Sequence, residues 1–552
     1  MFRSIAPYGR ARTFQIIASF LVFCIILSTL RLYRRQNPPP SIYDYTDGKT
    51  RGPAQNETAK TLPPSDETAY LRYLVREYGL TNEVPWFARR IRPESDARAR
   101  KSMTEIPGTK FMPRDFLRVR ADDERLDLHA EKTVQFSVAK SAMPDQVDAS
   151  ALLFGISTTY DRLTYGNSSL VGDWARWLTD GKGNSNGASL VLTLHRAESA
   201  EIDSANGKLR EAGIDAVVLP AENTQDSTAR YLDLVHLLAR RKDELQGEGR
   251  EKRFLALVDS DVFFPSLGKL LARLSKFNAK KKFYLGMPSE RADWAVENNV
   301  TLTYGGGVVM LTPPMVEDIS KLPCMNSTTS PDSSTKYAER TGQWDETLYN
   351  CIAEHTKENL YILPSLYVPG DDLYGLRTSY EGGVHPLVLH HYKHRHRFEA
   401  GKAHLVTSLC GEDCFLQRFF FFDDSWVLVN GHSLSQYPDG VAVLPASKST
   451  QNGNSNKSKV RTGERLILDK QDSAEKRLED RKIVSWAGAK RTWRLLDARA
   501  GPGGEVWQAY VKRRGAPVTY GDEDDRLPEG DTVHTQDGPS DVDSVIVLVW
   551  EP

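Results

Sequence analysis

The sequence predicts an α/β body with a parallel, doubly covered sheet, followed by a lobe rich in β-strands. Two observations support this fold class. Between residues 150 and 400, short apolar runs alternate with helical stretches, which is the pattern of strand–helix–strand units with right-handed crossovers. From residue 401 to 552 the apolar runs are short and separated by polar loops, which is typical of β-strands. We therefore expect two folded parts, one over each of these ranges.

Four apolar runs are the expected strands of the α/β body: Ala151–Ile156, Ser189–Leu194, Ala216–Leu219 and Phe254–Val258. The stretches between them include helical patterns with apolar residues on one face. In sheets of this kind, ligands bind beyond the carboxyl ends of the strands. The residues directly after each run are therefore the first candidates for a functional site.

The composition excludes several classes of protein. The chain has 552 residues, with 72 Lys+Arg against 73 Asp+Glu, and its net charge of -1 argues against nucleic acid as a partner. Hydrophobic residues make up 40% of the chain, enough for a sizeable core, so wholesale disorder is excluded. Five cysteines without a pair of CxxC units exclude a disulfide-scaffold miniprotein and a four-cysteine zinc module.

The N-terminal region predicts a membrane anchor. Residues 13–30 are all uncharged and nearly long enough to span a hydrocarbon layer of ~30 Å, so we expect a transmembrane signal anchor after a cytoplasmic tail of residues 1–12. The alternative is a cleaved signal peptide, which the arginines directly after the run disfavour. Five N-x-S/T sequons follow the run and favour a lumenal location for the rest of the chain: Asn56, Asn167, Asn299, Asn326 and Asn456.

Residues 31–149 are rich in proline, charged and polar residues, beginning with the run Pro38-Pro39-Pro40. This composition predicts a stem between the anchor and the folded body. Within it, Glu67–Leu80 has apolar residues at helical spacing, so part of the stem can pack on the body.

The sharpest chemical feature is Asp259-Ser260-Asp261, which directly follows the apolar run Phe254–Val258. Two carboxylates one residue apart at a strand end can share a divalent cation whose other ligands are diphosphate oxygens and water. Such an ion neutralises the charge that grows on a departing nucleotide. The alternative is a solvated turn, but the carboxyl end of a buried strand is where α/β sheets bind ligands.

Two further motifs lie downstream. Tyr304 is followed by Gly305, Gly306 and Gly307, which let the backbone approach a ligand closely, although a plain tight turn is the alternative. Asp345 lies near the start of a helical stretch, where it either caps the helix or acts as a general base towards an incoming hydroxyl. Spacing alone does not decide between these two roles of Asp345.

The stretch His385–His396 holds five of the 12 histidines of the chain. A neutral imidazole beside carboxylates favours Mn²⁺ over Ca²⁺. The alternative is an exposed basic strand, which describes His394 and His396. A dedicated zinc site has little support because no cysteine or glutamate lies at ligand spacing here.

Taken in order, ALLFGISTTYDRL, FLALVDSDVFF, YGGGVVML, GQWDETLYNCI and PLVLHHY resemble the Fringe-like branch of family 31 glycosyltransferases. The resemblance covers roughly Ala149 to Arg397 and depends on five motifs in the right order. It implies a type II membrane enzyme of the Golgi with a GT-A fold, in which the sheet is mixed but mostly parallel. It also implies inverting transfer of a sugar from a UDP-sugar to a hydroxyl of a glycan or glycoprotein acceptor.

The resemblance implies roles for individual residues. Asp259 and Asp261 match the metal- and nucleotide-binding triplet, whose middle residue is here Ser260 instead of a third acidic residue. His391 best matches the histidine that completes the Mn²⁺ site, with His390 as the alternative if the register slips by one. Asp345 matches the catalytic base, and Glu346 is a substitute base because this region departs from the family's run of aspartates.

Donor-binding residues follow from the same resemblance. Gly305, Gly306 and Gly307 match the glycine loop near the UDP-sugar, and Tyr160 and Arg162 fall where the family contacts the nucleotide. UDP-galactose and UDP-N-acetylglucosamine are the usual donors. The lobe over residues 401–552 has no counterpart in the animal Fringe proteins, so its role stays open.

Four cysteines lie beyond the expected anchor, and they allow three pairings. The simplest joins Cys324 with Cys351 and Cys410 with Cys414, and an oxidising lumen would permit both bridges. Two other functions are alternatives to the transferase: a catalytically silent carbohydrate- or partner-binding protein that keeps the fold, and a metal-dependent hydrolase of nucleotide sugars.

Overall fold

The computed structural model describes residues 66–97, 100–108, 110–113, 115–164, 170–222, 227–288, 305–325, 343–366, 379–383, 385–392, 399–445, 465–468, 482–516, 518–521, 534–536 and 541–552. The expected tail and anchor (residues 1–30), all five sequons, Tyr304, His394 and His396 lie outside these residues. Within the described residues, no helix combines the length and the apolar character needed to cross a membrane.

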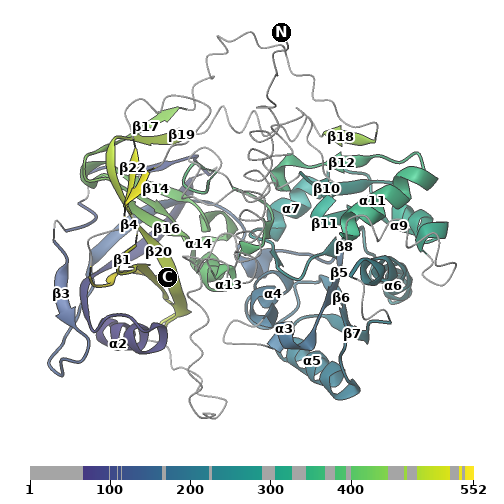
Figure 1. Cartoon of the computed structure of the whole chain (residues 1–552), viewed down its shortest axis with the longest axis horizontal. Helices are drawn as coiled ribbons and strands as arrows, with labels where there is room; N and C mark the ends of the chain where they lie inside the picture. The colour runs from purple at the N-terminus through teal and green to yellow at the C-terminus, as the bar shows by residue number, and fades with distance from the viewer. Residues whose placement is uncertain are drawn as a thin grey trace, which may run out of the picture. The chain divides into compact units, whose positions relative to one another are not determined.

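One of the two large sheets is the α/β sheet predicted from the sequence (Figure 1). Its eight strands, in spatial order, are β18 (Leu466–Leu468), β12 (Leu360–Ile362), β10 (Tyr284–Met287), β11 (Gly305–Leu311), β8 (Phe254–Val258), β5 (Leu152–Thr158), β6 (Ser189–Leu194) and β7 (Ala216–Pro220). Only β11 runs antiparallel to its neighbours, β8 and β10. The sheet is therefore mixed but mostly parallel, as expected of the GT-A fold, and the predicted fold class is confirmed.

Helices cover both faces of this sheet, because alternate residues of each buried strand enter different cores. In β8, Phe254, Ala256 and Val258 belong to one hydrophobic cluster, and Leu255 and Leu257 belong to the other. The helices of the α/β body are α3 (Tyr160–Thr164), α4 (Leu170–Leu178), α5 (Ser199–Glu211), α6 (Ser227–Gly247), α7 (Leu267–Leu274), α9 (Pro313–Ile319) and α11 (Trp344–His355). The double covering predicted from the strand–helix alternation is present.

The second large sheet, here called the β-rich sheet, confirms the predicted lobe of strands. Its strands from the C-terminal part are β14 (Arg418–Phe421), β15 (Trp426–Val429), β16 (Ser433–Gln436), β20 (Gly488–Ala500), β21 (Val506–Lys512), β22 (Val518–Gly521), β23 (His534–Gln536) and β24 (Ser544–Trp550). The same part of the chain also forms a separate two-stranded sheet of β17 (Val441–Pro445) and β19 (Lys482–Trp486). The C-terminal part also supplies β18, which extends the α/β sheet, so the boundary at residue 401 does not separate the two sheets.

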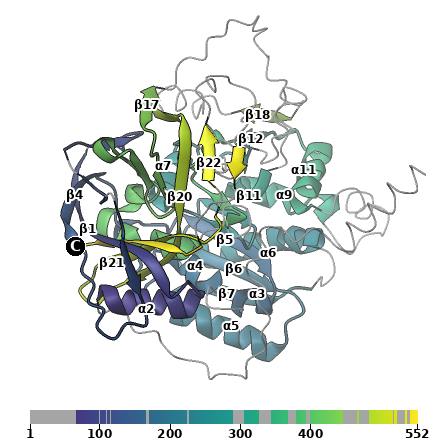
Figure 2. The same ribbon diagram turned by 60° about the vertical axis from the view of Figure 1, so that its left-hand side comes forward.

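The helix expected within Glu67–Leu80 is present and packs on the folded body, but the stem interpretation of residues 31–149 is wrong for residues 83–139. Residues 67–139 form α2 (Glu67–Tyr78), β1 (Glu83–Ala97), β2 (Thr104–Ile106), β3 (Leu117–Arg120) and β4 (Glu131–Ala139), and all four strands belong to the β-rich sheet. Figure 2 shows α2 beside β1 and β21. The composition misled because the charged side chains of β1 lie at its less buried positions, whereas Val84, Trp86 and Ala88 enter a core with Val545 and Val547 of β24.

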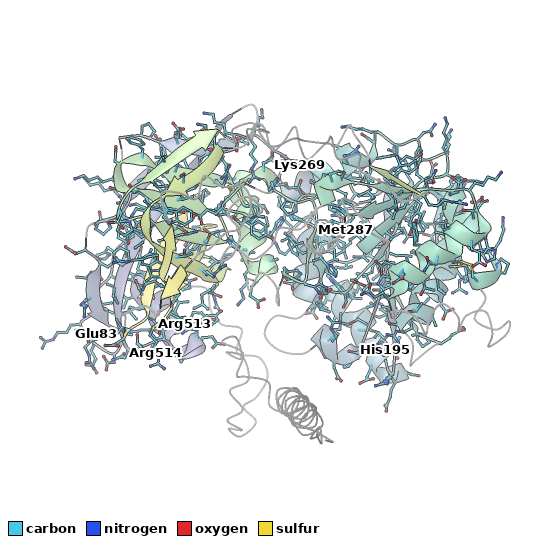
Figure 3. The ribbon with its side chains drawn as sticks, turned by 45° about the horizontal axis from the view of Figure 1, so that its top comes forward. Glu83, His195, Lys269, Met287, Arg513 and Arg514 are labelled. Carbon is cyan, nitrogen blue, oxygen red and sulfur yellow. A yellow bond between two sulfur atoms is a disulfide. The ribbon has the colours of Figure 1, made fainter. Side chains whose placement is uncertain are left out.

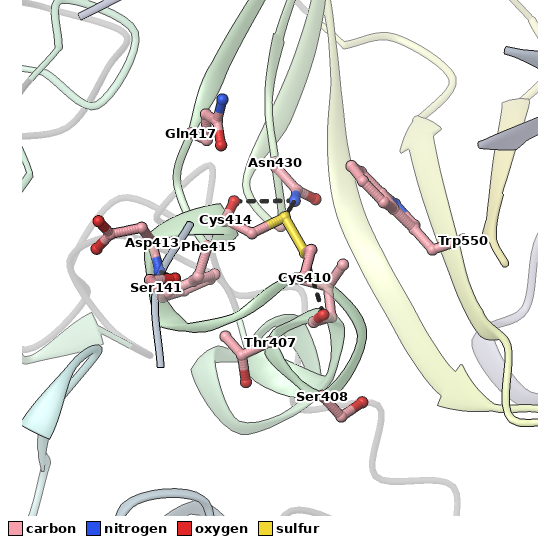
Figure 4. The surroundings of a disulfide bond; sticks show 12 residues. Ser141, Thr407, Ser408, Cys410, Asp413, Cys414, Phe415, Gln417, Asn430 and Trp550 are labelled. Atoms are coloured by element: carbon pink, nitrogen blue, oxygen red, sulfur yellow. Dashed lines mark hydrogen bonds between the residues drawn. A yellow bond between two sulfur atoms is a disulfide. The ribbon is translucent and has the colours of Figure 1, made fainter. Parts of the chain in front are cut away.

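Both predicted disulfides are present. Cys324–Cys351 joins the segment after α9 to α11. Cys410–Cys414 closes a short loop between α14 (Thr407–Cys410) and the β-rich sheet, where the side-chain amide of Asn430 donates to the carbonyl of Cys414 at 3.0 Å (Figure 4). These bonds are of the kind that persists in an oxidising compartment.

Candidate active site

The acidic triplet lies where the sequence predicts it, at the carboxyl end of β8. The backbone turns there: the Asp259 amide donates to the Gly307 carbonyl at 2.9 Å, and the Val262 amide donates back to the Asp259 carbonyl at 3.1 Å. Ser260 is buried, and the side chains of Asp259 and Asp261 are 28% and 16% exposed. Both carboxylates therefore reach solvent from a fixed backbone.

A two-stranded ladder brings the histidines to the triplet. Strand β9 (Val262–Phe263) pairs with β13 (Leu389–His390), with His390 opposite Val262. His390 Nε2 lies 3.2 Å from an Asp259 oxygen and 3.4 Å from an Asp261 oxygen. His391 Nδ1 lies 2.6 Å from the other Asp261 oxygen. The sequence favours His391 and leaves His390 as the alternative, and the structure brings both to Asp261.

His391 reaches the same carboxylate as its neighbour because its backbone is left-handed, with a φ of 53°. In an extended strand, consecutive side chains point to opposite faces, so His390 and His391 would diverge. Here their rings stack with centroids 3.7 Å apart. A non-glycine residue in this conformation costs about 1–3 kcal/mol and persists where its surroundings hold it, often at functional sites.

The cluster suits a divalent cation. One ligand atom from each of Asp261, His390 and His391 can be chosen so that all three lie within 4.8 Å of one another, and Asp259 adjoins His390. Burial raises the pKa of Asp261, but hydrogen bonds and charge interactions with His390 and His391 outweigh it and hold this pKa well below its usual range. Ionised carboxylate oxygens together with imidazole nitrogens are the ligands that Mn²⁺ and related transition metals accept.

Trp344 is a residue of the site that the sequence analysis did not single out. Its indole N–H donates to Asp259 Oδ1 at 2.8 Å, and its ring stacks on Tyr231 with centroids 4.4 Å apart. The Tyr231 hydroxyl in turn donates to the carbonyl of Val258, at the end of β8. The hydrogen bond holds one oxygen of Asp259, so that the other faces His390. The only sequence signal was that Trp344 stands directly before Asp345.

Trp344→Phe is expected to keep the ring stack on Tyr231 and to lose the hydrogen bond to Asp259. Groups that orient a metal ligand typically contribute about 10- to 100-fold to metal affinity. We expect Trp344→Phe to weaken Mn²⁺ binding by about tenfold, the lower end of that range, measured as an increase in the Kd for Mn²⁺. Trp177→Phe, in the core at α4, is the control and should leave this Kd unchanged. Equal Kd values for wild type and Trp344→Phe would contradict the role of Trp344.

The glycine run forms the start of β11, next to the acidic triplet. Gly307 has no room for a side chain, because a Cβ there would lie 2.7 Å from the His390 ring. Gly306 has a φ of 64°, and its amide donates to Asp345 Oδ2 at 3.1 Å. Met287, labelled in Figure 3, ends the neighbouring strand β10 and lies 3.4 Å from where a Cβ of Gly306 would be. The glycines thus bring the histidine and Asp345 to the same turn.

Asp345 lies in the first turn of α11, and its carboxylate faces the glycine run. Burial and the nearby charge of Asp259 raise the pKa of Asp345 to about 6. A carboxyl group with this pKa is ionised at neutral pH and is a stronger base than an ordinary aspartate. Glu346, the substitute base, is the next residue of the helix and is half-buried. The hydrogen bond from the Gly306 amide ties Asp345, and not Glu346, to the glycine run, which makes Asp345 the better candidate for the base.

Tyr160 and Arg162 lie after β5, the strand beside β8, and so at the same edge of the sheet. The Tyr160 hydroxyl is hydrogen-bonded to Ser204 of α5 at 2.9 Å, and Lys208 lies over its ring. Arg162 is exposed. Contact of either residue with a nucleotide stays a prediction.

Three arginines lie near His195, an arrangement that no motif in the sequence indicated. His195 follows β6 (Figure 3), and burial together with the charges of Arg230, Arg196 and Arg162 lowers its pKa. Arg196 is a second residue in the left-handed region, with a φ of 59°. Arg162, Arg196 and Arg230 come from α3, from the turn after β6 and from α6, and their charges favour the neutral form of the His195 imidazole.

No family model and no curated protein matches the chain. Similar solved structures include a glycosyltransferase involved in glycosylation of the major capsid of PBCV-1, with 8% identity and a TM-score of 0.23 over 44% of this chain and 92% of that chain. The galactosyltransferase LgtC, in complex with donor and acceptor sugar analogs, has 10% identity and a TM-score of 0.26 over 43% and 86%. Mouse xyloside xylosyltransferase 1 has 14% identity and a TM-score of 0.24 over 43% and 96%. Likenesses at this level carry no argument about activity, which must come from the site itself.

Proposed function

We propose that the protein is a GT-A glycosyltransferase of the Fringe-like type, which transfers a sugar from a UDP-sugar to a hydroxyl of a glycan or glycoprotein acceptor with inversion. The observation that carries the proposal is the meeting of Asp259 and Asp261 with His390 and His391, next to an aspartate with a pKa of about 6. Such a transfer requires a cation that stabilises the departing diphosphate and a base that deprotonates the acceptor hydroxyl.

Asp259, Asp261 and the two histidines are the residues that would hold the cation, for which Mn²⁺ fits the mixed oxygen and nitrogen ligands. When bound, such an ion stabilises the negative charge of a departing diphosphate. The protein contributes the geometry: the turn after β8 fixes the carboxylates, and the β9–β13 ladder fixes the imidazoles.

Asp345 is the proposed general base. Its carboxylate accepts the proton of the acceptor hydroxyl, and the oxygen attacks the anomeric carbon while UDP leaves from the opposite face, so the configuration inverts. The raised pKa favours this role because a base is most effective when its pKa lies just below the working pH. The amide of Gly306 orients the carboxylate.

The proposed donor site extends along the carboxyl edge of the sheet, from the glycine run beside β8 to the residues after β5. Gly305, Gly306 and Gly307 are proposed to lie beside the sugar diphosphate. Tyr160 and Arg162 are proposed to contact the nucleotide. UDP-galactose and UDP-N-acetylglucosamine are the first donors to test.

We further propose that residues 13–30 anchor the protein in the Golgi membrane as a type II protein, with residues 31–552 in the lumen. The two disulfides support an oxidising compartment. The charge-free run of residues 13–30 and the sequons after it support the orientation.

The test is a UDP-release assay on the full chain with a panel of UDP-sugars, with and without Mn²⁺ and with glycan acceptors. We expect release that requires both Mn²⁺ and an acceptor. Release that proceeds equally without an acceptor, yielding free sugar, would instead show a hydrolase. Binding of UDP and Mn²⁺ without release from any donor would show a silent binding protein and would overturn the proposal.

A further inference from the structure

The two histidines of the site lie on a segment that contacts both the β-rich sheet and the α/β body. Its described residues are 379–383 and 385–392, here called the histidine segment. At its end, the Tyr392 hydroxyl donates to the buried carboxylate of Asp173 in α4 at 2.6 Å. This contact holds the chain directly after His391.

The start of the histidine segment is held by the β-rich sheet through Glu381. One carboxylate oxygen of Glu381 accepts from Lys490 of β20 at 2.7 Å and from Ser435 of β16 at 3.1 Å. The other oxygen accepts from the hydroxyl of Tyr437, which follows β16. The Glu381 carbonyl accepts from Arg418 of β14 at 2.5 Å. Side chain and main chain of one residue therefore contact three elements of the β-rich sheet.

This network is buried and charged. The side chains of Lys490 and Glu381 are 5% and 2% exposed, and Arg418 is buried. Arg418 also donates to the carbonyls of Ser102 and Lys482, so its guanidinium is held from several sides. Replacing a buried ionic network by apolar residues of similar volume is often neutral or stabilising, so this network is weak evidence of a gain in stability, whereas removing one of its partners leaves a buried charge unpaired.

The other strand of the β9–β13 ladder is held from the same part of the chain. Glu412, within the loop closed by Cys410–Cys414, accepts from Ser266 at 2.6 Å and from the backbone amides of Leu267 and Gly268 at 3.1 Å, at the start of α7. Lys269 of the same helix (Figure 3) pairs with Asp413 at 2.5 Å. The C-terminal part thus holds the chain five residues after Asp261, at Ser266, as well as nine residues before His390, at Glu381.

We propose that Glu381 is a positioning residue for the cation site, through which the β-rich sheet holds His390 and His391 against Asp259 and Asp261. The proposal rests on the cation site of the proposed function. It assigns a role to the β-rich lobe: the lobe is a support for the histidine segment. Without the Glu381 contacts, the start of the histidine segment loses its hold on the β-rich sheet, while the ladder and the Tyr392–Asp173 bond remain. The left-handed backbone of His391, which needs its surroundings to persist, is then held from one side fewer.

The test measures Mn²⁺ binding to the full chain by the electron paramagnetic resonance signal of free Mn²⁺, with Asp261→Asn defining binding outside the site. Glu381→Gln keeps the size of the side chain and loses its charge, and Tyr437→Phe removes one hydroxyl. Residues that orient a metal ligand contribute about 10- to 100-fold to affinity. We expect the Kd for Mn²⁺ to rise about tenfold or more in Glu381→Gln and less in Tyr437→Phe.

Matched controls come from a second buried carboxylate of the β-rich sheet. Asp497 of β20 accepts from the hydroxyls of Tyr70 and Tyr78 and pairs with Arg499 and Lys402, so the partners of its carboxylate lie on α2, on β20 and at Lys402. Asp497→Asn is therefore the control for Glu381→Gln, and Tyr70→Phe is the control for Tyr437→Phe. They are expected to lower the melting temperature as their counterparts do and to leave the Kd for Mn²⁺ unchanged.

The outcomes separate two failures. If wild type shows Asp261-dependent binding, and Glu381→Gln and Tyr437→Phe bind as tightly as the controls, the positioning role is overturned and the proposed function stands. If wild type binds Mn²⁺ no better than Asp261→Asn, the cation site itself is overturned, and both proposals fall with it.

Discussion

Replacing Asp261 with asparagine is expected to abolish cation binding at the site. The change removes a charge that contacts both histidines, and hydrogen bonds from these histidines hold the pKa of this carboxyl low. Because groups that only orient a ligand contribute about 10- to 100-fold, loss of the ligand itself should raise the Kd for Mn²⁺ by about 100-fold or more. Mn²⁺-dependent UDP release should fall with it. Titration with Mn²⁺ and the release assay measure the two effects.

Asp215→Asn is the control for Asp261→Asn. Asp215 is also paired, with Arg250 and with the hydroxyl of Ser189, but it lies at the opposite end of the strands from the acidic triplet. It should change stability and leave Mn²⁺ affinity as in wild type. Retention of wild-type Mn²⁺ affinity by Asp261→Asn would show that the cluster does not bind the cation.

Asp345→Asn is expected to lower turnover by about 100- to 10,000-fold, which is the usual contribution of a general base. Cation affinity should change little, since Asp345 is not among the clustered ligand atoms. Glu346→Gln, one residue along the same helix, is the matched control and should retain turnover. If the two results were exchanged, the base would be Glu346.

The pH profile provides a second measurement on Asp345. With a pKa of about 6, the carboxyl is protonated and inactive as a base at lower pH, so kcat/KM should fall about tenfold for each pH unit below 6 and level off above it. Part of the raised pKa comes from the charge of Asp259, which a bound cation offsets, so the midpoint should move below 6 as Mn²⁺ becomes saturating.

Asp345 also has a stability consequence of defined sign. A carboxyl whose pKa is higher in the folded state than in the unfolded state makes the fold less stable as pH rises from about 4 through 6. Asp345→Asn should therefore melt at or above the wild-type temperature at pH 7.5. A clear loss of stability at that pH would assign Asp345 to helix capping, the alternative weighed from the sequence.

Some of the fold could be predicted from the sequence because buried parallel strands are continuous apolar runs. The predicted strands Ser189–Leu194 and Phe254–Val258 coincide with β6 and β8, and the other two differ by one or two residues at their ends. The β-rich sheet could be predicted only in its C-terminal strands. β1 pairs with β24 across more than 400 residues, and no local pattern indicates such a partner.

By itself, the sequence determined which chemical groups the site contains. Asp259 and Asp261 follow a strand that can be recognised from its apolar residues alone. The histidines and Asp345 can be named as candidates from their residue types before the fold is known. The tertiary structure decided how they combine. It brought both histidines to Asp261 through the β9–β13 ladder and the left-handed turn at His391, added Trp344 to Asp259, and placed Glu381 in the β-rich sheet. These contacts join residues dozens to more than a hundred positions apart, and because such pairings depend on backbone register and packing, no short stretch of sequence encodes them.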